Sequence, residues 1–324
     1  MSDVGENHRA KVLDMLQRCE RLEPDSIAGS LKVTLPSVSP KSIALRIGVT
    51  KLVYQVSHHL ETFRVKVRNT QLKRARSSLS VAHGLPGHAP PLLILMVYRA
   101  KNYELVEAFL RHVDTDADVR LWALDQIAPS LSRQTLGCGP GLRFPNLNEL
   151  YNATPVKEGS WVVVADDDFL FIRGSLVDTI NMMKRANLSL AQPGQSLWGW
   201  WSALFNVARP FMNARDTNYV EQGPLVIADP LFAQKIFPLP ETNDMGWGIE
   251  AEWYRMKDEN MRMGIVDACR VVHWNQNAES YAVAPEIIRM NERLASSGVD
   301  NIWQLQSVNG HWWRWQRTPT WKTR

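Results

Sequence analysis

Three consecutive carboxylates, Asp166, Asp167 and Asp168, directly follow the apolar run 161–165. The β-branched residues of that run predict a buried, parallel strand. Three like charges repel one another and cannot enter a core without compensating charge. At the carboxyl end of a parallel strand, that charge usually belongs to a ligand. Carboxylates at this density favour Mg²⁺ or Mn²⁺ with a substrate phosphate completing the shell. The alternative is a solvated turn, or acids at the start of the helix expected after Gly174.

A second group of candidate residues lies downstream. Trp247 stands between two glycines, which predicts close backbone approach and an indole face suited to stacking on a sugar ring. Glu250 and Glu252 open a predicted helix, where the alternative role of either acid is N-terminal capping. The run 264–273 predicts two short strands, the second ending in His273. We leave open whether this histidine is structural or a metal ligand.

The elements around these residues alternate between strands and helices. Strands are predicted at 92–98, 119–124 and 161–165, and helices at 102–112, through Leu147 and Leu150, and at 175–186. This order predicts an α/β sheet with right-handed connections and helices on both faces. Ligands of such sheets lie outside the carboxyl ends of the strands. Asp125, Arg143 and the three aspartates are therefore expected to gather at one edge.

Arg143 closes a glycine-rich loop, 137–143. Backbone N–H groups and a guanidinium both address phosphate oxygens, so this loop is suited to a diphosphate. The glycine spacing is neither that of the dinucleotide-binding fingerprint nor that of the P-loop. By itself the loop therefore gives only a weak signal.

The composition describes a soluble globular protein. The chain has 324 residues, of which 45% are hydrophobic and 22% charged. No apolar run is long enough to span a membrane, and the polar start is not a secretory signal. Cys19, Cys138 and Cys269 are too few and too scattered for a disulfide framework or a zinc site. We therefore expect a reducing, cytoplasmic location.

A basic segment precedes the first predicted strand. Between residues 64 and 76 the chain carries six Lys or Arg residues and no acid. The segment is a candidate for peripheral membrane contact, or it is a solvated face. Residues 77–90 have the composition of a linker. We divide the chain into an N-terminal appendage (1–90), a main domain (91–280) and a C-terminal helix with a Trp-rich tail (281–324). We expect no nucleic-acid partner.

The order of the motifs resembles the GT-A nucleotide-sugar glycosyltransferases, which have an Asp-x-Asp ending a central strand, a Gly-Trp-Gly-x-Glu turn and a late histidine. Residues 246–273 are similar to a little-characterised plant and bacterial family of GT-A transferases. That family has Gly-Trp-Gly-Leu-Asp, then Ile-Gly-Val-Val-Asp and a histidine, and its Phe-Val-Glu segment is similar to Tyr219-Val220-Glu221. The resemblance covers about residues 90–275 and implies a GT-A (Rossmann-like) fold with a mixed, mostly parallel sheet.

The resemblance also implies roles. It implies that the carboxylates of Asp166 and Asp168 bind the metal ion that holds the diphosphate, and that His273 is a further ligand of this Mn²⁺ (or Mg²⁺). It also implies that Glu250 is the general base of an inverting transfer. The predicted site residues are, for the nucleotide-sugar, Arg99, Asp125, Arg143, Asp166 and Asp167, and, for the acceptor, Trp247 and Glu252. Two departures from the family weaken the match: Glu250 stands where the family often has Asp, and Tyr98-Arg99 replaces small or acidic residues. Glu252 competes with Glu250 for the role of base and is expected to face solvent or to pair with Arg255 or Lys257.

The sequence thus predicts a metal-dependent glycosyltransferase that uses a nucleoside-diphosphate sugar and a hydroxyl acceptor, either a glycan, a lipid or a small molecule. One alternative is a protein of the same fold that binds a sugar nucleotide without turnover. The other is a nucleotidyltransferase, which usually carries a glycine-rich signature after its first strand. The residues from Tyr98 to Asn102 contain no glycine.

Overall fold

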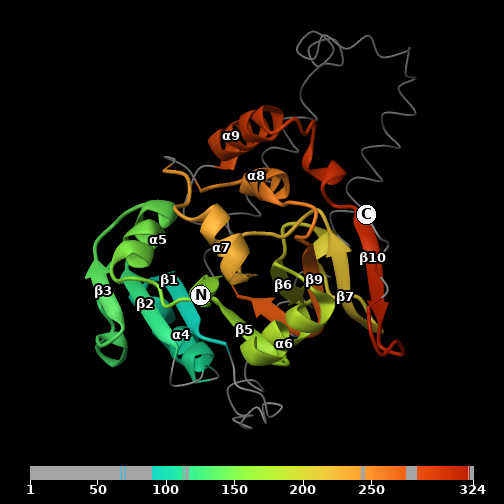
Figure 1. Ribbon diagram of the computed structural model, residues 1–324. Helices are drawn as coiled ribbons and strands as arrows, with labels where there is room; N and C mark the ends of the chain where they lie inside the picture. The colour runs from blue at the N-terminus through green and yellow to red at the C-terminus, as the bar shows by residue number, and fades with distance from the viewer. Residues whose placement is uncertain are drawn as a thin grey trace, which may run out of the picture. The chain divides into compact units, whose positions relative to one another are not determined.

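The computed structural model describes residues 90–111, 113, 117–241, 245–274, 283–319 and 321, together with Val67 and Thr70 (Figure 1). Apart from these two residues and Pro90, the predicted appendage and its basic segment lie outside the described residues. The predicted boundary near residue 280 does too. None of the helices in the described ranges combines the length and the apolar character that a membrane span requires.

The described strands form one sheet of ten. They are β1 (Leu92–Tyr98), β2 (Asp118–Ala123), β3 (Thr135–Cys138), β4 (Trp161–Ala165), β5 (Phe169–Arg173), β6 (Leu190–Gln195), β7 (Met212–Thr217), β8 (Leu225–Ala228), β9 (Met263–His273) and β10 (Val308–Trp313). The spatial order is β10-β7-β9-β6-β8-β4-β1-β2-β3, and β5 pairs with β9. The pairings set β5, β7 and β8 against the direction of the other strands. The predicted α/β class, with a mixed and mostly parallel sheet, is confirmed.

Helices cover both faces of this sheet (Figure 1). The described α-helices are α4 (Tyr103–Leu110), α5 (Arg143–Asn152), α6 (Leu176–Ala186), α7 (Pro230–Ile236), α8 (Ile249–Met256) and α9 (Val283–Ser296). Short 3₁₀ turns are found at Ala100–Asn102, Pro129–Leu131, Leu204–Asn206 and Ile302–Gln304.

The alternation of side chains along β1 explains how the two faces form. Ile94 and Met96 point into the core shared with α4 and α6, whereas Leu93 and Leu95 point into the core shared with α5, α7 and α8. A strand that is buried on both faces must be apolar at every position, which is why polar and apolar residues do not alternate along β1.

Three segments that the sequence analysis described differ in the structure. The run 264–273, read as two short strands, lies within one long strand, β9, whose pairing with β6 is interrupted by a bulge between Val266 and Arg270. The glycine-rich loop begins inside β3, where Gly137 leaves room for the ring of Trp122 across the strand pair. The Trp-rich tail supplies an end strand, β10, through antiparallel pairing with β7. Gly137 in β3 and Gly310 in β10 therefore obscured two strands, because glycine is depleted in strands.

A buried ion pair ties β7 to β9. Arg215 Nε donates to Asp267 Oδ2 at 2.9 Å, and both side chains are 0% exposed. The guanidinium also donates to the carbonyl of Phe205 at 2.9 Å, and the backbone N–H of Arg209 donates to Asp267 at 2.7 Å. These bonds offset the desolvation of both charges.

We expect Asp267→Ala to lower the free energy of unfolding by about 3–5 kcal/mol, because it leaves a guanidinium buried without its counter-charge. Urea denaturation of the full chain measures the change. The matched control is Asp258→Ala, which breaks a surface pair with Lys235 and should leave the unfolding midpoint nearly unchanged. Equal midpoint shifts in the two variants would contradict this expectation.

Candidate metal and nucleotide site

The three aspartates form the turn between β4 and β5. The backbone N–H of Asp166 donates to the carbonyl of Pro224 at 2.8 Å, and the N–H of Trp274 donates to the carbonyl of Asp168 at 2.7 Å. A side chain at Gly223 would collide with the carboxylate of Asp166, so the segment before β8 approaches the turn closely only as glycine. The turn is thus fixed by the neighbouring strands at the carboxyl end of β4.

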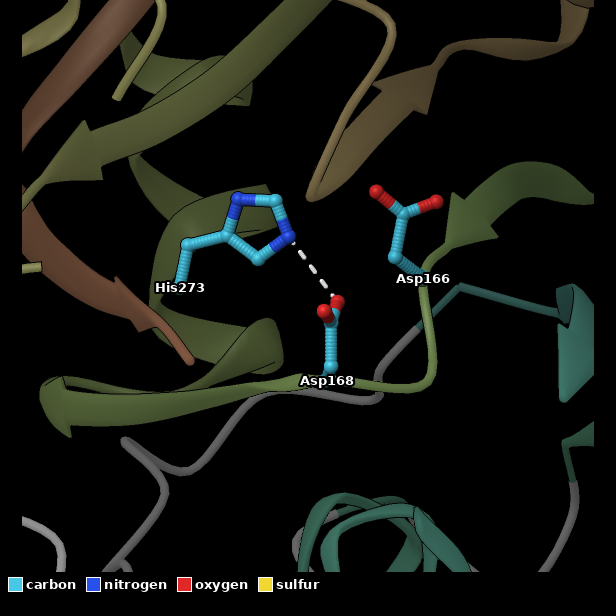
Figure 2. Close-up of side chains that lie close together, drawn as sticks. All are labelled: Asp166, Asp168 and His273. Carbon is cyan, nitrogen blue, oxygen red and sulfur yellow. Dashed lines mark hydrogen bonds and ion pairs between the residues drawn. The ribbon is translucent and has the colours of Figure 1, made fainter. Parts of the chain in front are cut away.

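His273 reaches this turn from the end of β9. Its strand pairs antiparallel with β5, which sets His273 opposite Phe169, the residue after Asp168. The imidazole Nε2 lies 2.9 Å from Asp168 Oδ1. One ligand atom from each of Asp166, Asp168 and His273 lies within 4.8 Å of the others, and the side chains face one another (Figure 2).

Arg143 supplies positive charge on the other side of Asp166. It is the first residue of α5, and its guanidinium lies 2.7 Å from Asp166 Oδ1. The same guanidinium donates to the side chain of Gln222 at 2.9 Å and to its carbonyl at 3.1 Å. Arg143 was predicted to bind a diphosphate; here it also holds Asp166 and the segment before β8 in position.

The charges of this cluster are strongly coupled. Burial raises the pKa of Asp166, with the Asp168 carboxylate adding to the effect, although Arg143 and His273 oppose it. Burial and the charge of Asp168 raise the pKa of Asp167 to about 6. Burial disfavours the charged imidazolium of His273, but its carboxylate neighbours, Asp168 first, raise its pKa to about 9. The cluster thus has an excess of acid that a cation would stabilise.

The triad fits a divalent cation by spacing and by donor type. Two ligands at about 2.1 Å from one ion lie about 3 Å apart when they are at a right angle and about 4.2 Å apart when they are on opposite sides. His273 Nε2 and Asp168 Oδ1 are 2.9 Å apart, and all three ligand atoms lie within 4.8 Å of one another. Two carboxylates and one imidazole form a mixed oxygen and nitrogen donor set, which Mn²⁺ accepts more readily than Mg²⁺ does. Between His273 Nε2 and Asp168 Oδ1, a bound ion would take the place of the proton that the two atoms now share in a hydrogen bond.

Three of the predicted nucleotide-sugar residues meet at the adjoining end of β1. The N–H of Arg99 donates to Asp167 Oδ2 at 2.6 Å, and the N–H of Ala100 donates to Asp125 Oδ1 at 2.8 Å. Burial opposes the charged form of Asp125, but several backbone N–H groups and the nearby Arg99 together outweigh it and lower the pKa of Asp125. The structure therefore brings Arg99, Asp125 and Asp167 together, as expected for parallel strands that end at one edge.

Glu250 lies on α8, immediately after the Gly-Trp-Gly turn. Gly246 and Gly248 adopt φ values of +76° and +88°, a region that favours glycine, so the turn could not form with other residues without strain. Glu250 is 3% exposed and accepts from the N–H groups of Gly248 at 3.1 Å and Gln222 at 3.4 Å. Burial, together with the nearby Glu221 carboxylate, raises the pKa of Glu250 to about 7.

A chain of contacts connects Glu250 to the metal triad. Its carboxylate accepts from the backbone of Gln222, and the side chain of Gln222 accepts from Arg143, which in turn pairs with Asp166. The second constellation in the sequence is therefore joined to the first by the segment that precedes β8.

Glu252 has a partner that the sequence analysis did not name. Its carboxylate lies 2.9 Å from Arg293 Nε on α9, whereas a pairing with Arg255 or Lys257 stays a prediction. Arg293 also donates to the carbonyl of Trp247 at 2.7 Å. The prediction considered only neighbours along the same helix, whereas α9 packs against α8 and supplies the guanidinium. A role of Trp247 or Glu252 in acceptor binding stays a prediction.

Glu221 is a candidate residue that the site prediction omitted. Its carboxylate accepts from Ser202, from Asn206 at 2.5 Å and from Gln195 at 2.7 Å. Burial raises the pKa of Glu221 to about 7, although its hydrogen bonds and the charge of His273 oppose the shift. It lies in irregular chain between β7 and β8, where no periodicity marks it. The only signal was the Tyr219-Val220-Glu221 match within the resemblance.

The tryptophan-rich loop after β6 lies against His273. The N–H of Trp200 donates to the carbonyl of His273 at 3.2 Å, and a side chain at Gly199 would come within 3.1 Å of the His273 nitrogen. Trp198, Trp200 and Trp201 are half-buried, so none of them is a core residue. The contact with His273 places Trp200 at the end of β9.

The solved structures that are similar to this chain include those of GalNAc-T7 and TarS, both at low sequence identity. No protein-family model matches the chain, and no curated protein matches it. GalNAc-T7, crystallised with UDP, GalNAc and Mn²⁺, is 9% identical with a TM-score of 0.41, over 64% of this chain and 48% of that one. TarS 1–349 of S. aureus, in complex with UDP-GlcNAc, is 12% identical with a TM-score of 0.42, over 65% of this chain and 66% of that one. The chain thus spans about half of the first protein and just under two thirds of the second. Because both TM-scores are below 0.5, we infer nothing about activity from them.

Proposed function

We propose that the chain is a metal-dependent glycosyltransferase of the GT-A type, which moves a sugar from a nucleoside-diphosphate sugar to an acceptor hydroxyl. The observation that carries this proposal is the convergence of Asp166, Asp168 and His273 at the carboxyl end of β4, joined through Arg143 and Gln222 to the buried carboxylate of Glu250. The motif order of the sequence supports the same function.

The metal and the nucleotide have defined residues in this proposal. Asp166, Asp168 and His273 would hold Mn²⁺, or Mg²⁺, which when bound offsets the charge of the diphosphate leaving group. Arg143 lies beside Asp166 and would add positive charge next to the same phosphates. Arg99, Asp125 and Asp167 would contact the nucleotide at the end of β1.

Glu250 would act as the general base of an inverting transfer. A pKa of about 7 means that a large fraction of the carboxylate is deprotonated near neutral pH and yet basic enough to accept the proton of the acceptor hydroxyl. Trp247, at the preceding turn, and the loop that carries Trp198 would line the acceptor side and exclude water, so that transfer outcompetes hydrolysis. We propose a cytoplasmic protein whose acceptor is a glycan, a lipid or a small molecule.

Titration calorimetry with nucleoside diphosphates, with and without Mn²⁺, tests this function. We expect at least one diphosphate to bind only with the metal present. Metal-dependent binding without turnover of any nucleotide sugar, offered with sugar, glycan and lipid acceptors, would favour the non-catalytic alternative. Release of pyrophosphate from a nucleoside triphosphate and a sugar phosphate would favour a nucleotidyltransferase. Absence of any nucleotide binding would reject the proposal.

We also expect Mn²⁺ to support a higher transfer rate than Mg²⁺, because the site has an imidazole ligand, which the harder Mg²⁺ accepts less readily. Initial rates measured at matched metal concentrations test this order. Excess EDTA should abolish transfer, and Mn²⁺ added back should restore it. Full activity in EDTA would show that the triad holds no ion needed for the reaction.

A further inference from the structure

Three aromatic rings stack along the end strand β10 and the turn that follows it. The ring centroids of His311 and Trp313 are 5.6 Å apart at 11°, and those of Trp313 and Trp315 are 4.9 Å apart at 9°. Trp312 is buried in the core, so strand alternation places its two neighbours on the opposite face of the sheet. The stack ends on Trp315, which is 70% exposed. An indole face at the end of this column is open to a further ring.

Arginines gather beside this stack. Arg173 and Arg270 are cross-strand partners on β5 and β9, and Arg314 precedes Trp315. Burial lowers the pKa of Arg270, and the positive charges of Arg173 and Arg314 lower it further, which places all three within electrostatic reach. Within the described ranges, none of the three forms an ion pair, and the buried Nε of Arg270 has no hydrogen-bond partner. The Asp267 carboxylate opposes this shift in the pKa of Arg270, but it is already paired with Arg215, so the three like charges favour a bound anion.

The opposite end of the stack also carries a cation. Arg209 Nη1 lies 3.4 Å from Nε2 of His311. Burial, together with the charge of Arg209, lowers the pKa of His311, so this ring is neutral near pH 7 and stacks as an aromatic group. The column of rings is therefore flanked by guanidinium groups at both ends.

We infer that the arginine–tryptophan surface, defined by Arg173, Arg270, Trp313, Arg314 and Trp315, binds a saccharide that carries an anionic group, either a carboxylate or a phosphate. The apolar face of a sugar ring stacks on an exposed indole, and a guanidinium bonds a carboxylate or phosphate through two parallel N–H groups. The inference does not depend on the proposed transfer reaction, because the residues of this surface are not those of the metal triad.

The arrangement of the rings favours a saccharide over a single-stranded nucleic acid. Nucleic-acid platforms offer separate aromatic faces on which successive bases stack. Here His311, Trp313 and Trp315 cover one another, so a single outer face remains for one ring. One ring face with several guanidiniums beside it suits a charged sugar unit.

Binding to defined oligosaccharides tests the inference in the full chain, without metal or nucleotide. The probes are hexagalacturonate, a phosphorylated maltohexaose and neutral maltohexaose, with oligothymidylate and phosphatidylglycerol-containing vesicles as rival ligands. Trp315→Ala and Arg314→Glu are compared with two matched controls elsewhere on the surface. These are Trp303→Ala, at an indole that is 71% exposed, and Arg133→Glu, at another exposed arginine.

We expect at least one anionic oligosaccharide to bind, and its affinity to fall about tenfold in each surface variant and to stay unchanged in each control. Binding of hexagalacturonate would identify the anionic group as a carboxylate, and binding of the phosphorylated maltohexaose would identify it as a phosphate. Residues 64–76 are the same in every variant, so any anion binding by that segment contributes equally to all the affinities and does not affect their ratios. Equal binding of neutral maltohexaose, absence of all saccharide binding, or an undiminished affinity in Trp315→Ala would overturn the inference. So would binding of only oligothymidylate or only the vesicles.

Discussion

Asp168→Asn is expected to weaken metal-dependent nucleoside-diphosphate binding by about 100-fold or more. Loss of a residue that merely supports a metal ligand costs about 10–100-fold, and Asp168 is itself a proposed ligand. The amide keeps the shape of the side chain but removes the charge that balances His273 and the ion. Calorimetry with Mn²⁺ and the diphosphate that binds the native chain measures the loss.

The control for this variant is Asp300→Asn, at an exposed position outside the triad. It should bind the diphosphate as the native chain does. Asp168 accepts a backbone hydrogen bond from Trp274, so a change at this position could also disturb the fold. Thermal denaturation of both variants shows whether a loss of binding reflects the site or the fold. Unchanged affinity in a folded Asp168→Asn protein would place the metal elsewhere.

The position of Asp166 and Asp168 could be predicted from strand direction, because both follow a buried strand whose carboxyl end lies at the ligand-binding edge of a parallel sheet. The place of His273 beside them was implied only by the resemblance, since the residues alone left open whether this histidine is structural or a metal ligand. The strand β5, which sets His273 opposite Phe169, was not recognised. Its five residues follow the acids at once, and so short an apolar run has no period of its own.

The partners of the charged residues could not be predicted in the same way. Arg143 pairs with Asp166 and Gln222, and Glu252 pairs with Arg293, across separations in sequence that no local pattern encodes. Glu221 lies in chain without regular structure, and its donors come from the last residue of β6 and from the segment that follows β6. Such pairings follow from how the helices and loops pack, which the hydrophobic period does not specify.

Two carboxylates of this site have the pKa suited to a general base, Glu250 and Glu221, each at about 7. Glu221 is occupied by three side-chain donors that fix the tryptophan-rich loop, whereas Glu250 accepts from two backbone N–H groups beside the turn that carries Trp247. We therefore assign Glu221 a positioning role and Glu250 the role of base.

Glu250→Gln should lower the transfer rate by roughly 10²–10⁴-fold, the usual contribution of a positioned general base. Donor affinity should change little, because the base addresses the acceptor hydroxyl. In the native chain the transfer rate should rise with pH through about 7, since only the deprotonated carboxylate accepts a proton, and this rise should be absent from Glu250→Gln.

Steady-state rates, donor affinity and the pH profile of three variants decide the assignment. Glu252→Gln is the matched control on the same helix and should be much milder, because Glu252 pairs with Arg293 on α9 and is not part of the contacts that join Glu250 to Gln222 and Arg143. Glu221→Gln should retain the rise with pH through about 7 even if its rate is lower, because a positioning residue changes the amplitude and not the titrating group. If Glu221→Gln loses that rise while Glu250→Gln keeps it, Glu221 is the base; if Glu252→Gln is the inactive variant, the proton is taken from the other side of α8.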